Sequence, residues 1–288
     1  MEPYVVSGAI AAATEIATSL DLRATNAIVL HNSNKLALRL TPCDVLARVT
    51  HADEAGAQIE VDRARRLAAA GCPVGVVEPH VDPLVYMRGR FAVTMWTYYE
   101  PASPQLSAVD YAQALARLHA GMASLDLASP RFTDRIADAE QVADEPDLSP
   151  ELADSDRALL SSTLGTLRRR IVAHGSKEQL LHGEPHPGNV LSTTNGPLFI
   201  DFETSCYGPV EFDLAYVPEA VCEHYPGVDR ELLDDCRQLV LAMVAAWRWS
   251  LGDEFPNRRR WGQEFLSALR HGPPWPTLDK MTRRLEDW

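Results

Sequence analysis

The segment from Leu181 to Tyr216 constrains the fold and the chemistry of this chain more than any other part of the sequence. Its sequence is LHGEPHPGNVLSTTNGPLFIDFETSCYGPVEFDLAY. The pattern predicts a loop, two short strands around a turn at Asn195-Gly196, and a second loop that leads into a helix. The segment also carries five polar or ionisable side chains that could serve a reaction: His182, Glu184, Asn189, Asp201 and Glu203.

Asp201 is the most informative of these residues. Pro187 and Gly188 would favour a turn in any protein, but Asp201 follows the apolar strand residues Leu198–Ile200. A carboxylate at that place costs free energy unless it has a partner such as a metal ion. A carboxylate, an Asn five positions later and an Asp at a strand end form the arrangement that phosphoryl transfer requires. We therefore expect Glu184 near an attacking hydroxyl, and Asn189 and Asp201 as ligands of Mg²⁺ on a nucleotide.

The same residues resemble the catalytic segment of the aminoglycoside phosphotransferase and choline kinase group of small-molecule kinases. That group has His-Gly-Asp, then an Asn, a strand ending in Ile-Asp-[Phe/Trp]-Glu, and a downstream Asp-Leu-Ala. This chain has His-Gly-Glu at 182–184, Asn189, Ile-Asp-Phe-Glu at 200–203 and Asp-Leu-Ala at 213–215. The resemblance implies that ATP and Mg²⁺ are the cofactors and that a small hydroxylated molecule accepts the γ-phosphate. It also implies that His182 braces the catalytic loop and that Asp213 ties it to the lobe beneath.

The resemblance further implies a two-lobed, protein-kinase-like α+β fold. Residues 1–98 would form an N-lobe with a small antiparallel sheet and a helix, which binds the nucleotide. Residues 99–288 would form a larger, mainly helical C-lobe with the catalytic loop, the metal site and the substrate cleft. Two residues depart from the group's pattern: Glu184 replaces the catalytic Asp, and Arg48 replaces the nucleotide-binding Lys. These departures leave open an alternative, a nucleotide-binding pseudokinase that acts as a regulatory or interaction module.

Three short apolar runs near the N-terminus predict the strands of the small sheet. They cover residues 27–30, 35–40 and 45–50, with polar turns between them. The resemblance places the first turn, with Ser33 and Asn34, over the nucleotide phosphates. It gives Arg48 the role of the phosphate-binding cation, which Lys35 and Arg39 could share.

Residues 57–70 have strong helix propensity and end before Gly71 and Pro73. Ile59, Ala64 and Leu67 would form the apolar face of this helix. In the resembled group a Glu of this helix holds the strand cation toward the phosphates. We expect Glu60 to pair with Arg48, with Glu54 as the rival.

Residues 90–99 are β-branched and aromatic and are followed by a Pro-rich break, as expected of a strand that ends in a hinge between lobes. The resemblance places the hinge backbone at Met95, Trp96 and Thr97 beside the adenine, whereas the side chains of Met95 and Trp96 are of types that are more often core residues. Residues 111–122 predict a helix in which His119 is a structural histidine.

Composition limits the other possibilities. The net charge of −13 argues against nucleic acid as a partner, because phosphate binding favours a basic surface. No run of 18 uncharged apolar residues occurs, so we expect no membrane partner. The five scattered cysteines suit a reducing cytoplasm. The six acids of residues 219–235 could attract a cationic substrate or could simply form a solvated helix face. The sequence leaves the oligomeric state open.

Overall fold

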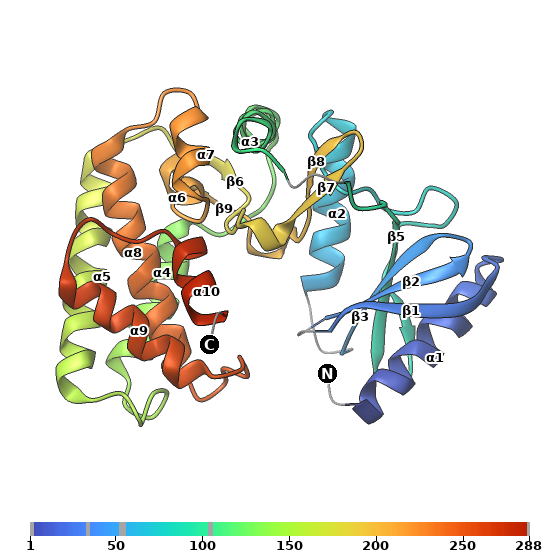
Figure 1. The fold of residues 1–288 in the computed structure, drawn as a ribbon, viewed down its shortest axis with the longest axis horizontal. Coiled ribbons are helices and arrows are strands. Elements are labelled where there is room, and N and C mark those ends of the chain that lie inside the picture. Colours follow the sequence, from blue (N-terminus) through green and yellow to red (C-terminus); the bar gives the residue numbers. More distant parts are fainter. Residues whose placement is uncertain (1–2, 33–34, 52–55, 103–105, 287–288) are drawn as a thin grey trace. The chain divides into compact units, whose positions relative to one another are not determined.

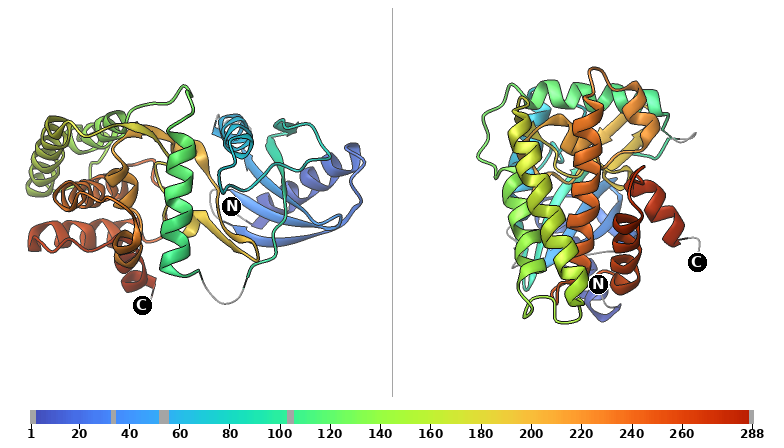
Figure 2. Two further views of the ribbon diagram at one scale, coloured as in Figure 1. Left: turned by 90° about the horizontal axis from the view of Figure 1, so that it is seen from above. Right: turned by 90° about the vertical axis from the view of Figure 1, so that its left-hand side faces the viewer.

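The structure is a computed structural model that describes residues 3–32, 35–51, 56–102 and 106–286. The chain forms two compact units (Figures 1 and 2). The first unit contains residues 1–106 and 190–203, and the second contains residues 107–189 and 204–288. The sequence-based boundary after residue 98 remains a prediction, and it did not anticipate that residues 190–203 cluster with the N-terminal part of the chain.

A five-stranded antiparallel sheet forms the centre of the first unit. Its strands lie in the order β1-β2-β3-β5-β4, so the three predicted strands are present and two more extend them. Their bounds are β1 Ala24–Asn32, β2 Leu36–Pro42, β3 Val45–His51, β4 Tyr86–Arg88 and β5 Phe91–Thr97. Helix α1 (Pro3–Ser19) packs on one face of the sheet (Figure 1).

Strand periodicity decides what each face of this sheet carries. Alternate residues point to opposite faces, and the apolar set of β2 and β3 is fully buried with α1: Leu36, Leu38, Leu40, Val45, Ala47 and Val49. Arg48 is out of phase with that set and therefore lies on the other face, opposite Ala37 of β2 and Thr94 of β5.

Helix α2 and a hairpin complete the first unit. Helix α2 spans Gly56–Ala69, and the hairpin consists of β7 (Val190–Thr193) and β8 (Gly196–Phe199). The Gly75 N–H donates to the Phe199 carbonyl at 2.9 Å, and the Ala102 N–H donates to the Ser192 carbonyl at 2.8 Å. These backbone bonds join the hairpin to segments at least ninety residues earlier in the chain.

The buried face of α2 differs from the prediction at one position. Ile59 was expected on the apolar face but is 44% exposed, whereas Val61 is fully buried. The buried face is centred on Glu60, Ala64 and Leu67, and Ile59 lies about 100° around the helix from Glu60. An ionisable residue, not an apolar one, occupies that inward position.

The second unit is mainly helical, and Figure 2 shows its long helices side by side. Helix α8 packs against α4, α5 and α9, and Leu239, Ala242 and Ala246 in it are fully buried. The helices are α3 Ala108–Met122, α4 Phe132–Asp144, α5 Asp154–His174, α6 Val210–Leu214, α7 Glu219–His224, α8 Arg230–Trp249, α9 Arg258–His271 and α10 Leu278–Glu286. A two-stranded sheet pairs β6 (Gln179–Leu181) with β9 (Cys206–Gly208). Within the described residues, no helix is both long and apolar enough to cross a bilayer.

Candidate active site

A buried hydrogen-bond network fixes the loop that follows β6. Asp213 of α6 is fully buried and accepts hydrogen bonds from the backbone N–H groups of His182 at 2.9 Å and Gly183 at 2.8 Å. Its carboxylate also lies 3.0 Å from Nε2 of His119, whose Nδ1 lies 2.8 Å from the Tyr225 hydroxyl. His119 is therefore a structural histidine, as predicted. The network ties the catalytic loop to α3 and α6, which is the role that the resemblance implied for Asp213.

Gly183 is required by the backbone conformation of this loop. Its φ is +94°, in the region that favours glycine. A Cβ added at this position would lie 2.1 Å from the backbone oxygen of Thr204. No side chain can be accommodated there without moving the backbone.

Glu184 projects from this fixed loop and contacts Arg135 of α4. Its backbone N–H lies 3.3 Å from Nδ1 of His182, so the fully buried His182 braces the loop from within. The Arg135 guanidinium donates both to the Glu184 carboxylate and, at 3.0 Å, to the Gly183 carbonyl. The Glu184 side chain is 27% exposed, so the carboxylate remains accessible at this anchored position.

Asn189 ends a short 3₁₀ turn (η1, Pro187–Asn189) in the same loop. Its side-chain amide donates from Nδ2 to the Glu184 carbonyl at 3.0 Å. This bond uses the nitrogen, so the side-chain oxygen is the atom that could bind a cation. The buried Tyr111 hydroxyl donates to the Pro185 carbonyl and anchors the segment between Glu184 and Asn189.

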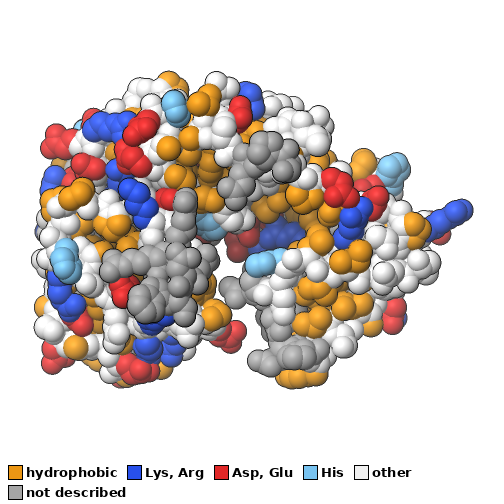
Figure 3. Space-filling model, viewed as in Figure 1, with side chains coloured by type: hydrophobic (Ala, Val, Ile, Leu, Met, Phe, Trp, Pro, Cys, Tyr) orange, Lys and Arg blue, Asp and Glu red, His pale blue; other side chains and the backbone are white. Residues whose placement is uncertain are grey.

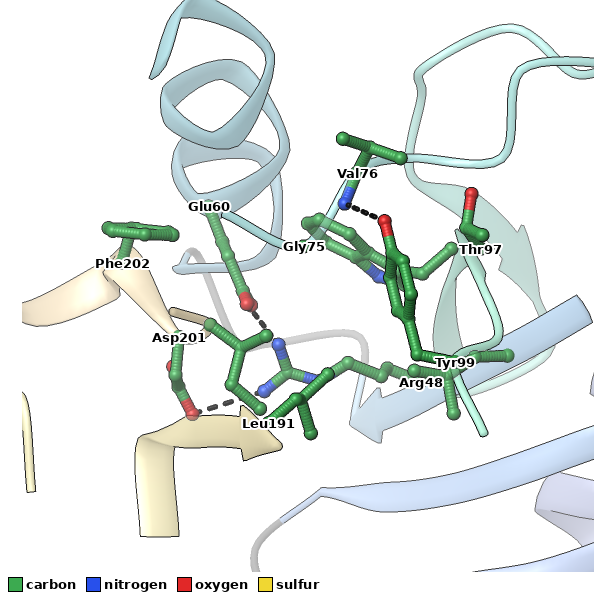
Figure 4. Close-up of a pocket in the computed structure, with 12 residues that line it drawn as sticks. Arg48, Glu60, Gly75, Val76, Thr97, Tyr99, Leu191, Asp201 and Phe202 are labelled. Atoms are coloured by element: carbon green, nitrogen blue, oxygen red, sulfur yellow. Dashed lines mark hydrogen bonds and ion pairs between the residues drawn. The ribbon is translucent and has the colours of Figure 1, made fainter. Parts of the chain in front are cut away.

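Five charged side chains meet in the first unit, on the face of the sheet opposite α1. The predicted ion pair between Arg48 and Glu60 is present, and Nη2 of Arg48 also lies 3.1 Å from Asp201 (Figure 4). Nζ of Lys35 lies 2.5 Å from Glu203, 3.2 Å from Asp201 and 3.4 Å from Glu60. We call these five residues the charge cluster.

Burial and charge act against each other in the charge cluster. Desolvation acts to lower the pKa of Lys35, but the carboxylates of Glu60, Asp201 and Glu203 together raise it above its ordinary value. Burial raises the pKa of Glu60, and the cations Arg48 and Lys35 oppose that effect. Two cations and three carboxylates leave the cluster with one excess negative charge, which favours a further cation.

The three carboxylates of the cluster suit a divalent cation. Oxygen atoms of Glu60, Asp201 and Glu203 lie within 4.8 Å of one another. Mg²⁺ prefers carboxylate oxygens of this kind. Asp201 also has a φ of +70°, a conformation that costs an L-residue about 1–2 kcal/mol. Strained residues persist where the surrounding structure requires them, and here the strain directs the carboxylate into the cluster.

Glu60 should contribute to stability through the cluster. The Glu60→Gln variant removes the closest partner of Arg48 from a site where Glu60 is 3% exposed. We expect the free energy of unfolding to fall by about 1–3 kcal/mol, because a charged group then keeps fewer partners in a buried site. Urea unfolding measures the change. The matched control is Glu203→Gln, whose side chain is 37% exposed and should change stability by less than about 1 kcal/mol; equal losses would contradict the expectation.

A pocket with apolar walls ends at this cluster (Figure 4). Figure 4 shows Glu60 pointing toward the Arg48 guanidinium from above and Asp201 pointing toward it from the lower left. Backbone groups close the far side, where the Thr97 N–H donates to the Val76 carbonyl at 3.0 Å. The lining residues are Leu46, Arg48, Glu60, Gly75, Val76, Trp96, Thr97, Tyr99, Leu191, Ile200, Asp201 and Phe202.

The predicted hinge residues divide between this pocket and the core. Trp96 and Thr97 line the pocket. The Met95 side chain is 1% exposed and lies in the core with α1, in agreement with the core interpretation of this residue. The period of two in β5 turns Met95 away from its neighbours. Ser33, Asn34 and the rival Glu54 lie outside the described residues.

The family model described as the phosphotransferase enzyme family matches residues 29–261. The chain belongs to this family. No curated protein sequence is significantly similar to it. The matched range of this family member includes the charge cluster and the loop that carries Glu184 and Asn189.

Solved structures resemble the phosphotransferase-family chain in fold. A choline/ethanolamine kinase family protein from Mesorhizobium loti is 18% identical, with a TM-score of 0.69 over 92% of this chain and 95% of that chain. The GDP complex of an aminoglycoside 2′-phosphotransferase-IIIa is 14% identical, with a TM-score of 0.70 over 91% of this chain and 98% of that chain. An amicoumacin kinase in complex with AMP-PNP, Ca²⁺ and Ami is 11% identical, with a TM-score of 0.67 over 96% of this chain and 99% of that chain. The fold is therefore the protein-kinase-like α+β fold predicted from the sequence.

Two residues of this family member were missed or underrated by sequence reasoning. Lys35 was considered only as a substitute for Arg48, yet it contacts three carboxylates of the charge cluster. Arg135 was not singled out at all. Arg39, the other considered substitute, pairs instead with Asp44 and Glu100.

Proposed function

We propose that this protein is an ATP-dependent small-molecule O-phosphotransferase. The observation that carries the proposal is the charge cluster at the end of an apolar pocket that Trp96 and Thr97 line. Apolar walls suit a purine base, and adjacent cations suit its phosphates. Family membership supports the same conclusion.

Each site residue has a role in this proposal. Arg48 and Lys35 would contact the nucleotide phosphates, with Arg48 held by Glu60. Asp201 and Asn189 would bind Mg²⁺, which neutralises charge that develops on the transferred group. Trp96, Thr97 and the backbone near Met95 would lie against the base, and Ser33 and Asn34 would cover the phosphates.

Glu184 would orient the acceptor. In the transfer, the acceptor oxygen forms a bond to the γ-phosphorus. The bond from that phosphorus to the β–γ bridging oxygen breaks, and its electron pair stays on ADP. The acceptor proton is released to solvent by way of the Glu184 carboxylate. Because the transition state is loose, orientation of the acceptor contributes more than proton removal, and a Glu can serve in place of an Asp.

The acceptor we propose is a small hydroxylated molecule, and amine-bearing compounds are the class to test first. The acids of residues 219–235 were the sequence argument for an amine. Glu219, Asp234 and Asp235 are paired with arginines, and Asp229 contacts His174, so much of this charge is already compensated. On the face in Figure 3, acidic and basic side chains are interspersed over the helices of the second unit.

Nucleotide binding is the first test. Mg-ATP at a hundred times its dissociation constant should stabilise the protein by about 2.7 kcal/mol, which thermal unfolding detects as a rise in Tm. Mg-GTP, each nucleotide alone and Mg²⁺ alone complete the set. The Arg48→Lys variant should keep a smaller shift, because Lys retains the charge but not the planar fork. No shift with either nucleotide would contradict the proposal.

The second candidate is the nucleotide-binding module without turnover. The observation that favours it is the hydrogen bond from Arg135 to Oε1 of Glu184, because this oxygen is then less available to an acceptor. A Mg-dependent shift without phosphate release to water or to any of a panel of hydroxylated amines would support this candidate over the kinase.

A further inference from the structure

The contact between Arg135 and Glu184 is built into the second unit. Arg135 lies in α4, 49 residues before Glu184, and its side chain is 12% exposed. Its guanidinium donates hydrogen bonds to two adjacent residues of the loop that follows β6. One goes to the Gly183 carbonyl at 3.0 Å, and the other goes to Oε1 of Glu184. Two donors of one planar group therefore fix both the backbone and the side chain of the loop.

The surroundings of Arg135 hold it in place. The centre of its guanidinium lies 5.4 Å from the centroid of the Trp247 ring and 6.0 Å from that of Phe212. Aromatic faces attract a guanidinium at such distances. On the same helix, Phe132 and Ile136 are buried and anchor α4 on either side of Arg135. A guanidinium with a fixed orientation can set the orientation of the carboxylate that it binds.

The length of the Glu184 side chain matches this contact. An Asp at position 184 would place its carboxylate one methylene, about 1.5 Å, closer to the backbone and beyond the present hydrogen bond. Arg135 therefore accounts for the Glu at a position where the resembled kinases have Asp. The contact uses Oε1 and leaves Oε2 to face an acceptor.

We propose that Arg135 is a positioning residue that holds the Glu184 carboxylate so that Oε2 can orient the acceptor hydroxyl. The inference rests on the phosphotransferase function proposed above. It adds a specific partner for the catalytic carboxylate and makes Arg135 and Glu184 a functional pair. Loss of either member should then cost activity, and loss of both should cost little more than loss of one.

A double-mutant cycle with Mg-ATP and water as the acceptor tests this pair. Phosphate release is measured for the wild type, Arg135→Ala, Glu184→Asp and the double variant, with Mg-AMP-PNP affinity and Tm for each. We expect Arg135→Ala to lower the release rate by about 30- to 100-fold, as misplacement of a reacting group by about 1 Å does. The affinity for Mg-AMP-PNP should change less than threefold. In the Glu184→Asp background, adding Arg135→Ala should lower the rate of phosphate release by less than threefold.

Chemical rescue separates positioning from general structural support. Guanidinium at low millimolar concentration, far below denaturing levels, should restore part of the activity of Arg135→Ala and none of that of the double variant. Arg135→Lys covers the case in which the Ala variant does not fold, and it should be slower than the wild type because an ammonium lacks the planar fork. Arg248→Met tests a cation near Glu184 that does not hold the loop backbone. Because Arg248 also interacts electrostatically with Glu184, a second control is Arg168→Met: the Arg168 guanidinium is 2.7 Å from Glu140 of α4, so its loss should change the rate less than threefold.

The outcomes distinguish this inference from the proposed function. Two results would overturn the pairing and leave the kinase function intact. One is a wild-type rate of phosphate release in Arg135→Ala, and the other is an equal loss of rate from Arg135→Ala with Glu or Asp at position 184. Absence of phosphate transfer to water and to every member of the panel of hydroxylated amines, in a wild-type protein that binds Mg-AMP-PNP, would overturn both. A rate that falls only in parallel with Tm, without rescue by guanidinium, would reduce Arg135 to a structural role and overturn the inference.

Discussion

Asp201→Asn should lower Mg-dependent phosphate transfer from ATP by about a thousandfold or more, because the reaction depends on metal-held phosphates. The substitution removes the charge that would bind Mg²⁺ but keeps the size of the side chain. Asn tolerates the left-handed conformation that Asp201 adopts at φ +70°, whereas Ala would add strain. The protein should therefore remain folded while its metal-dependent activity is lost.

Phosphate release at increasing Mg²⁺ concentration measures this effect, with circular dichroism as the check of folding. Glu203→Gln is the matched control, since it removes a neighbouring carboxylate that binds Lys35 at 2.5 Å. We expect a smaller loss for it, because Asp201, two residues after the end of β8, is the proposed metal ligand. Near wild-type activity in Asp201→Asn would show that the metal site has been assigned to the wrong carboxylate.

Gly183→Ala should have the largest effect on stability. The new Cβ would lie 2.1 Å from a backbone oxygen at a φ of +94°, and a backbone oxygen cannot rotate away as a side chain can. We expect the free energy of unfolding to fall by about 3–5 kcal/mol, in the range of steric clashes in buried sites. Urea unfolding provides the measurement.

Gly196→Ala separates steric clash from backbone strain. Gly196 has a φ of +102°, but a Cβ there would meet nothing within 4 Å. Its cost should be only the conformational strain, about 1–2 kcal/mol. If the two variants lose equal stability, the Thr204 carbonyl is not the cause of the effect at Gly183.

The pairing of Arg48 with Glu60 could be predicted from the resemblance, because both residues lie in regular elements that match a strand and a helix of the resembled group. A strand with a period of two and a helix with a period of 3.6 fix which side chains share a face. The same periodicity separates Met95 from Trp96. The two residues are adjacent in β5, so the Met95 side chain points into the core with α1 and that of Trp96 points to the pocket.

The contact between Arg135 and Glu184 could not be predicted in the same way. The two residues are far apart in sequence, and only the tertiary packing of α4 against the catalytic loop brings them together. One signal was present: Arg135 lies three residues after Phe132 and four before Ala139, both of which are buried. A cation on the apolar stripe of a helix requires a partner, although the sequence does not identify it.

Residues 190–203 belong to the first unit although they follow the second unit's first segment in sequence, and this has a consequence for biosynthesis. Synthesis proceeds from the N-terminus, so Arg48, Lys35 and Glu60 leave the ribosome long before Asp201 and Glu203. At about 5–20 residues per second, the second group follows the first by roughly ten seconds or more. During that interval the nascent first unit lacks a hairpin and two of its three site carboxylates. The first unit is therefore completed late, after the chain that separates its two parts has been made.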